Sequence, residues 1–287
     1  MNKRLLINLG LLSLIIVLVL ISVGLDNEAP EEKTVVSSID ITYIDNINVT
    51  RQDKPALQFS KQQDKWFMNE PLKIRVNVAR INAMLKLATS ESHSEFNVSE
   101  VDLAALGLAQ PEITLSLNDH LFQFGTTDGI DQRRYVLYQD KIYMVNDFLY
   151  AQLDSKPGFF ADTLLLPEGT KLKKIEFPNN TFSFNDNVWQ MQTLMDIKPD
   201  QITKLVYSWE NATAISVSSY QTPQMDFPIV LTTQDDKTIR YEIVSTAPYL
   251  ILGRKDLEIQ YHMASDEAQK LLFQENTIDA QQDEAVN

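Results

Sequence analysis

Histidine is the side chain in this sequence best suited to acid–base catalysis or metal binding near neutral pH, because its pKa is roughly 6.5. The three histidines, His93, His120 and His262, stand far apart in the chain. None belongs to an H-E-x-x-H motif, which would place two imidazoles on one metal ion. We expect His120 in a hairpin turn and His262 at a strand end, each as a surface or half-buried polar residue. The sequence therefore predicts no catalytic, cofactor-binding or metal-binding residue.

Acidic residues are numerous enough to form neighbouring pairs by chance. The stretch 128–131, Asp-Gly-Ile-Asp, faintly resembles a calcium loop but lacks the spaced oxygen ligands and the distal Glu of an EF-hand. A turn is the better interpretation, because Asp and Gly favour turns. The pairs Glu31-Glu32 and Asp235-Asp236 fall in spacer or turn positions, where solvation explains them. A glycosidase would need two carboxylates held across a cleft, which no spacing here indicates.

Motifs of two large enzyme classes are missing from the sequence. It contains no G-x-S-x-G elbow, so a serine hydrolase of the α/β type is not expected. It also contains no G-x-x-x-x-G-K-[ST] loop, so any ATP hydrolysis associated with this chain must take place in a partner.

Aromatic residues give one further hint of function, because they could line a groove for a sugar or a peptide. We instead expect the two repeated tryptophans, Trp66 and Trp189, to anchor two hydrophobic cores, since large aromatic side chains dominate buried area. The residues concerned are Trp66, Phe67, Trp189, Trp209, Tyr249 and Tyr261.

The first 25 residues predict a membrane anchor. Lys3 and Arg4 precede an apolar run, Leu5 to Leu25, and about 20 such residues are enough for a helix to cross a bilayer. A signal peptide cleaved near Ser22-Val23-Gly24 is the alternative, but its apolar region would be shorter. The cations before the run favour a cytoplasmic N-terminus and a periplasmic body. The chain has no cysteine, which excludes a lipoprotein anchor and disulfides.

The part of the chain after residue 25 is strongly acidic. It holds 23 Lys and Arg (25 minus Lys3 and Arg4) against 39 Asp and Glu, a net charge of −16. Nucleic acids and anionic lipids are bound by clustered cations, so we expect no nucleic-acid partner. Residues 26–38 are predicted to be a solvated linker, and residues 274–287 a disordered tail.

The elements that would position any site occur twice along the chain. Period-two alternation at 39–44 and 57–59 predicts strands, and so does alternation at 174–177 and 181–184. Eleven residues separate Trp66 from Asn77, and eleven separate Trp189 from Asp200. Both Asn77 and Asp200 are good N-cap types, and each precedes an i, i+3, i+7 apolar stripe typical of a helix.

The downstream halves of the two units also correspond. Strands follow Pro111 and Pro228, hairpins are predicted at 135–145 and 249–263, and short helices at 147–153 and 265–273. The first unit has an additional predicted helix, Ser99 to Gly107, with a capping-box start and a glycine stop. The predicted class is α+β, an N-terminal transmembrane helix followed by two tandem repeats of antiparallel sheet plus helix. Its parts are 1–25 anchor, 26–38 linker, 39–154 first repeat, 155–170 inter-repeat linker, 171–273 second repeat and 274–287 tail.

Several stretches carry a resemblance to a known family. They are W-F-M-N-E-P (66–71), A-R-I-N-A-M-L-K-L (79–87), D-L-A-A-L-G-L-A-Q-P (102–111), F-G (124–125) and R-Y-V-L-Y-Q-D-K-I-Y-M-V (134–145). Over about residues 57 to 273 the chain resembles anchored bacterial envelope proteins known as a domain of unknown function, often encoded beside gliding-motility-type ABC transporters. The resemblance implies a non-enzymatic role near an ABC permease and implies no catalytic residues. The acidic balance and acidic tail depart from many relatives.

From these observations we expect a single-pass protein of the bacterial inner membrane that binds or scaffolds without catalysis. Its expected partners are the lipid bilayer and an ABC permease and ATPase complex, and it needs no cofactor. The alternative is a periplasmic enzyme that acts on glycan or peptide through an unrecognised site, which would require convergent polar groups in a deep cleft.

Overall fold

The structure is a computed structural model that describes residues 11–12, 14–17, 34–192, 198–223 and 227–272. The predicted anchor at 1–25 lies largely outside the described residues, as do residues 26–33 of the predicted linker and the predicted tail. Among the helices that are described, none is both long enough and apolar enough to cross a membrane.

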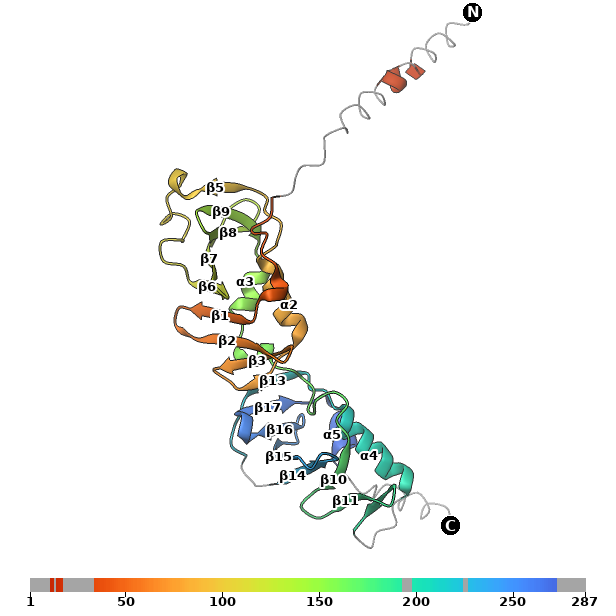
Figure 1. Ribbon diagram of the computed structural model, residues 1–287. Coiled ribbons are helices and arrows are strands. Elements are labelled where there is room, and N and C mark those ends of the chain that lie inside the picture. The colour runs from red at the N-terminus through yellow and green to blue at the C-terminus, as the bar shows by residue number, and fades with distance from the viewer. Residues whose placement is uncertain (1–10, 13, 18–33, 193–197, 224–226, 273–287) are drawn as a thin grey trace, which may run out of the picture.

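The first half of the chain forms a nine-stranded antiparallel sheet (Figure 1). Its strands lie in the order β4-β3-β2-β1-β6-β7-β8-β9-β5. They are β1 (Asn46–Arg51), β2 (Lys54–Gln62), β3 (Lys65–Glu70), β4 (Ile74–Arg75), β5 (Glu95–Asn97), β6 (Ile113–Leu117), β7 (His120–Thr127), β8 (Arg133–Tyr138) and β9 (Lys141–Asn146).

The second half forms an eight-stranded antiparallel sheet in the order β12-β11-β10-β14-β15-β16-β17-β13. Its strands are β10 (Leu172–Glu176), β11 (Thr181–Asn185), β12 (Val188–Met191), β13 (Ser216–Ser219), β14 (Pro228–Thr233), β15 (Thr238–Ser245), β16 (Ile251–Arg254) and β17 (Ile259–His262). The two strand orders correspond when β10–β12 are matched to β1–β3, and β13–β17 to β5–β9. Strand β4 of the first sheet has no counterpart among the described strands of the second sheet. The two sheets therefore share one topology, and the predicted antiparallel sheets are confirmed; the described part of the chain is mostly sheet with few helices.

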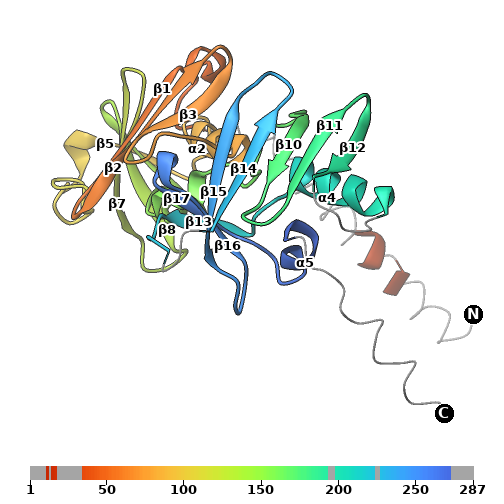
Figure 2. The same cartoon turned by 90° about the horizontal axis from the view of Figure 1, so that it is seen from below.

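The helices occupy corresponding places in the two halves: the first helix of each half precedes β5 or β13, and the second follows β9 or β17. They are α2 (Val78–Leu87), α3 (Phe148–Leu153), α4 (Pro199–Asn211) and α5 (Glu267–Leu271), with short 3-10 turns η1 (Ile41–Tyr43), η2 (Val98–Glu100), η3 (Pro157–Phe160) and η4 (Lys255–Leu257). In the first half, α2 contacts α3, and in the second half α4 contacts α5. Each pair lies beside its own sheet (Figures 1 and 2).

The helix starts were predicted with mixed success. Asn77 does cap α2, because its side-chain oxygen accepts a hydrogen bond from Ala79 N at 3.1 Å. The prediction that Asp200 caps the second helix is wrong: α4 begins at Pro199 and its N-cap is Lys198, two residues before Asp200. The Gln201 side chain accepts a hydrogen bond from Lys198 N at 3.2 Å. Proline suits the first helical position because its missing N–H would have no partner there.

Two further predicted elements differ from the structure. The alternation at 39–44 forms no strand, because the Asp40 carboxylate accepts a hydrogen bond from Thr42 N at 3.0 Å and stabilises η1. The predicted helix from Ser99 to Gly107 is instead η2 followed by a turn. The Asp102 carboxylate accepts a hydrogen bond from Ala104 N at 2.9 Å and so favours that turn.

The end of the predicted linker is packed rather than solvated. Val36 is 1% exposed, and Val36 N donates a hydrogen bond to Ser90 O at 3.0 Å. The Ser37 hydroxyl is buried and donates to Ala88 O at 2.6 Å. Residues 34–38 therefore belong to the first module, which we define as residues 34–154; residues 171–272 form the second module.

Candidate functional site

The histidines lie on separate parts of the fold. His93 is exposed. His120 opens β7, directly after a turn, and its Nδ1 lies 2.9 Å from the Tyr138 hydroxyl. His262 ends β17, and its Nε2 lies 2.8 Å from the Ser218 hydroxyl. The predicted position of His262 at a strand end is thus confirmed, whereas His120 is the first residue of a strand and not part of the hairpin turn in which it was predicted. The described residues contain no group of three or more His, Asp or Glu arranged to hold a metal ion.

The acidic stretches also lie where turns were predicted. The Asp128 carboxylate accepts hydrogen bonds from Asp131 N at 3.2 Å and Arg133 N at 2.7 Å. Slight burial raises the pKa of Asp128, and these backbone hydrogen bonds outweigh it and lower that pKa. Asp235 pairs with Lys237 at 2.7 Å, in the turn between β14 and β15. Glu31 and Glu32 lie outside the described residues.

The aromatic residues divide between core and surface. Trp66, Trp209 and Tyr261 are buried, at 8%, 0% and 3% exposure, whereas Trp189 is half-buried and Tyr249 is 52% exposed. Trp209 donates a hydrogen bond from Nε1 to Leu271 O at 3.0 Å, which holds α5 against α4. The expectation that the two repeated tryptophans anchor the two cores is confirmed for Trp66 only, because Trp189 is half-buried at the margin of the core and Trp209 is the buried tryptophan of the second module.

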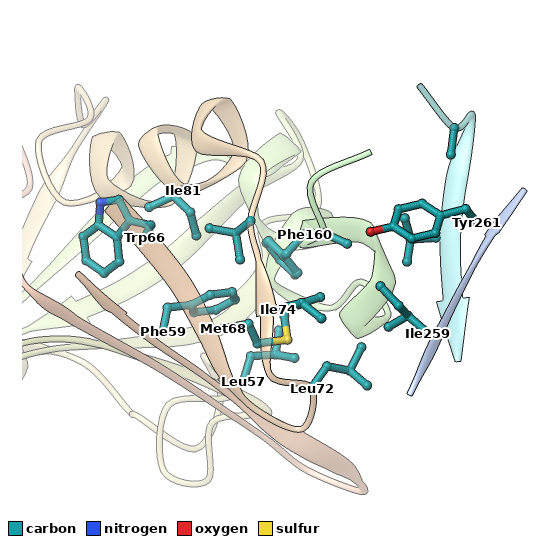
Figure 3. Close-up of a cluster of buried hydrophobic side chains, with 14 of the residues drawn as sticks. Leu57, Phe59, Trp66, Met68, Leu72, Ile74, Ile81, Phe160, Ile259 and Tyr261 are labelled. Carbon is teal, nitrogen blue, oxygen red and sulfur yellow. The ribbon is translucent and has the colours of Figure 1, made fainter. Parts of the chain in front are cut away.

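A partly enclosed site with charged residues among apolar walls lies between the two modules, where the segment 155–170 runs. This segment was predicted as a linker, but it is largely packed: Phe160, Leu165 and Leu166 are at most 2% exposed. It bridges both inner sheet edges, since Ala161 pairs with Val76 beyond β4 and Leu164 pairs with Thr213 before β13. The hydrophobic core therefore runs without interruption from one module into the other (Figure 3).

A glycine makes the close approach to the second module possible. A Cβ added at Gly158 would lie 2.1 Å from Val217 O on β13, a distance that real Cβ atoms do not reach. The backbone of η3 thus rests directly on a strand of the second sheet. Only glycine, which has no Cβ, permits this contact without moving one of the two backbones.

An ion pair joins the first module to the junction segment. Arg75, on the edge strand β4, lies 2.7 Å from the Asp162 carboxylate through Nη1 and donates from Nη2 to Leu164 O at 2.8 Å. The two side chains are 31% and 23% exposed, so the pair is partly shielded from water. Such a charge-assisted arrangement fixes geometry as well as adding stability.

A second arginine lies on the opposite side of the junction. Arg254 of β16 binds both oxygens of Asp256, at 2.8 and 2.7 Å, and its guanidinium lies 5.3 Å from the centre of the Tyr241 ring. The hydrogen bonds from Arg254 lower the pKa of Asp256. Tyr241 donates from its hydroxyl to Leu165 O at 2.6 Å, so the second module holds the junction segment as well.

Two phenols at the junction are kept neutral by their surroundings. Burial raises the pKa of Tyr241, and the nearby Tyr261 raises it further. Burial also raises the pKa of Tyr261, against the opposing effect of Arg254 and Arg75. Both hydroxyls are therefore protonated at neutral pH, so Tyr241 remains a hydrogen-bond donor.

A small cavity of about 270 Å³ lies between these groups. Its charged lining residues are Lys73, Arg75, Asp162 and Arg254, and its other walls are mostly apolar, among them Phe67, Leu257 and Tyr261. Figure 3 shows Tyr261 and Ile259 directed from the second module toward Phe160 of the junction segment. The arrangement is suited to holding the two modules in one relative orientation.

A second close contact explains two of the stretches on which the family resemblance rests. The turn at 102–109 crosses the first sheet at Gly125, where Thr126 N donates to Leu106 O at 2.9 Å. A Cβ at Gly125 would lie 2.2 Å from the same Leu106 oxygen. Gly107 adopts φ +69°, which L residues rarely adopt. The stretch D-L-A-A-L-G-L and the F-G strand end therefore form one contact.

The junction residues were not identified from the sequence. Arg75 and Asp162 are ordinary charged residues far apart in the sequence, which is a weak signal because most charged side chains simply face water. Pro157 and Gly158 are residue types that favour a turn, but they do not reveal that the backbone at Gly158 touches a strand.

Comparison with known proteins gives one match. No curated protein and no solved structure matches the chain. Residues 66–187 match a family model described as a domain of unknown function (DUF4340). These residues include the contact between Gly125 and Leu106 and the whole junction segment. Over this region the chain is similar to a family of domains of unknown function, as its sequence predicts.

Proposed function

We propose that this chain is a non-catalytic, membrane-anchored binding or scaffold protein of the periplasm, and an accessory component of an ABC-type transport or envelope-assembly complex. The observation that carries the proposal is the arrangement of sheet edges. The inner edges, β4 and β13, meet at the junction segment, while β5 and β12 end the two sheets at opposite ends of the body (Figure 2).

An edge strand carries N–H and C=O groups that can pair with an extended segment of another chain. The strand β12 suits this mode of binding, because Val188 is 51% exposed and Trp189 beside it is half-buried. The junction keeps the two modules in one orientation, so a partner at β12 would be held at a defined position relative to the first module.

The apolar run at 5–25 supports the membrane part of the proposal. A tether raises the local concentration of the binding surface beside a membrane partner. The ABC part rests on the resemblance of the sequence to proteins associated with such transporters.

Purification of the full chain from gently solubilised membranes tests the proposal. We expect a permease or ATPase subunit to accompany it. A V188K variant, which places a charge on the edge strand β12, should lower this recovery by severalfold. The matched control is I130K, which adds the same charge at a residue that is 90% exposed in a turn far from any sheet edge. Recovery of the chain with no transporter subunit would contradict the proposal.

A further inference from the structure

One face of the first sheet is lined by neutral polar side chains. On β1, β2 and β6 the buried residues, such as Ile47, Phe59 and Leu115, alternate with residues of the opposite face. We call this opposite surface the carboxamide face. Its central residues are Asn46, Asn48, Thr50, Gln58, Ser60, Thr114 and Ser116.

The register places these side chains directly beside one another. Asn48 lies opposite Gln58 on β2 and opposite Ser116 on β6, and Asn46 lies opposite Ser60. Asn69 extends the row onto β3, where its amide donates to the Ser60 hydroxyl at 2.9 Å. Adjacent strands are about 4.8 Å apart, so the row presents closely spaced donors and acceptors.

The second module has the same sheet topology, but the equivalent positions of its sheet face carry charged residues. In the second module, Ile175 is opposite Leu231, just as Val49 is opposite Leu115. This equivalence places Lys174 at the position of Asn48 and Glu176 at the position of Thr50. Lys174 and Glu176 form an ion pair of 2.8 Å.

Strand β15, which is separated from β10 by β14 in the second sheet, also carries charged residues on this face. Arg240 and Glu242 of β15 share the face of Glu176, and their side chains approach to 3.5 Å. The corresponding strand β7 of the first sheet carries Gln123 opposite Thr114. The net charge of the chain is −14. The face of the second sheet carries ion pairs, and the carboxamide face of the first sheet carries none at the equivalent positions.

A polar atom of this face has no partner. The Oδ1 atom of Asn48 is buried and accepts no hydrogen bond within the described part of the chain. A buried acceptor without a donor is unfavourable, so a donor supplied by a ligand would be stabilising here. Asn48 lines an open depression of about 210 Å³ together with Asn46, Gln58, Asn69 and Ser116.

An aromatic ring borders the same face. Phe67 of β3 lies opposite Ser60 of β2. The Phe67 side chain is half-buried and also lines the junction cavity. Its ring offers an apolar surface beside the row of amides and hydroxyls. Apolar and polar contacts are therefore available side by side, as an amphipathic ligand requires.

We infer that the carboxamide face binds a neutral glycan chain. A carboxamide offers two N–H donors and a carbonyl acceptor, which match the hydroxyl and acetamido groups of a sugar. Binding at the centre of the face desolvates little charge, because its central residues and the sugar are neutral, whereas Glu70 (opposite Gln58) and Arg75 (opposite Phe67) lie only at its border. The Asn48 amide reaches a sugar hydroxyl after a small rotation about its broad terminal torsion, and the orphan acceptor is then satisfied.

This inference deepens the proposed binding role by naming a ligand class. It is tested with the full chain in a detergent that has no sugar headgroup, titrated with neutral tetrasaccharides of glucose and of N-acetylglucosamine. The key variant is N48K/T50E, which gives the first module the pair that the second module already tolerates. We expect at least a tenfold loss of affinity in this variant with an unchanged circular dichroism spectrum.

The matched control is K174N/E176T, which makes the reverse exchange in the second module and should leave affinity unchanged. An anionic tetragalacturonate should bind more weakly than the neutral sugars, because the chain is acidic. Absence of binding to both neutral sugars, or equal binding by N48K/T50E, overturns the inference. These titrations involve no transporter subunit, so their failure is distinct from a failure of co-purification.

Discussion

Gly125 lies so close to Leu106 that a Cβ on the glycine would be 2.2 Å from the leucine carbonyl oxygen. The turn at 102–109 is held on the first sheet by this contact and by the hydrogen bond from Thr126 N to the same oxygen. The two stretches are about 20 residues apart in sequence, and their pairing is a property of the fold that either stretch alone does not reveal.

A methyl group at Gly125 should therefore destabilise the protein. We expect G125A to lower the free energy of unfolding by about 1–3 kcal/mol, because the backbone of the turn must move. Urea unfolding of the full chain measures the effect. G129A is the control, since a Cβ at Gly129 meets nothing within 4 Å, and its effect should stay within about 0.5 kcal/mol. Equal stability of the two variants would show that the turn adapts to the added methyl group.

Loss of Arg75 should loosen the junction between the modules. R75A removes the ion pair with Asp162 and the hydrogen bond to Leu164 O, which together should cost about 1–3 kcal/mol. Limited proteolysis should then cut faster within 155–170. K54A removes the exposed pair with Asp154, whose side chains are 46% and 41% exposed, and should leave this cleavage rate unchanged. An unchanged rate in R75A would mean that apolar packing alone fixes the junction.

Replacement of Trp209 by phenylalanine should release α5. W209F leaves the Leu271 carbonyl without its indole donor and opens a void in the core, at a cost of about 1–3 kcal/mol. Hydrogen exchange of residues 267–271 should become faster than in the wild type. Y207F changes a ring on the same helix that is 67% exposed, and exchange there should not differ from the wild type.

Stability at high pH should depend on Tyr150. Burial, followed by the hydrogen bond that its hydroxyl donates to Glu112 at 2.7 Å, raises the pKa of Tyr150 to about 12. In the unfolded chain this phenol ionises near pH 10, so the unfolded state binds fewer protons between roughly pH 10 and 12. The stabilisation from Tyr150 is complete below pH 10 and is lost as the pH rises toward 12.

The measurement is the urea midpoint at pH 9 and at pH 11. Y150F should lose less stability than the wild type between these two values. Y249F, which alters a tyrosine that is 52% exposed, should follow the wild type. A Y150F variant with the same decline as the wild type would assign the pH dependence to the buried phenols Tyr241 and Tyr261.

The sequence was most informative where side-chain periodicity is strong. The hairpin at 135–145 and the start of α2 at Asn77 are readable because alternation and capping are local properties. The central strand β1 was missed, because its outward positions, Asn46 and Asn48, are of a type depleted in strands. Those same asparagines form the carboxamide face. The contact between Arg75 and Asp162 joins positions 87 residues apart, and no local pattern reports such a distance.

The packing of Val36 against the first module shortens the segment that connects the predicted membrane anchor to the fold. If the chain leaves the bilayer at residue 25 as predicted, eight residues, 26–33, connect it to the fold rather than the thirteen of 26–38. Eight residues reach at most about 26–29 Å, against about 43–47 Å for thirteen. A force transmitted from the anchor would then act first on the antiparallel β-bridge between Val35 and Glu91. The first module would then lie close to the membrane surface, and the second module, held in a fixed orientation relative to the first, would lie farther from it.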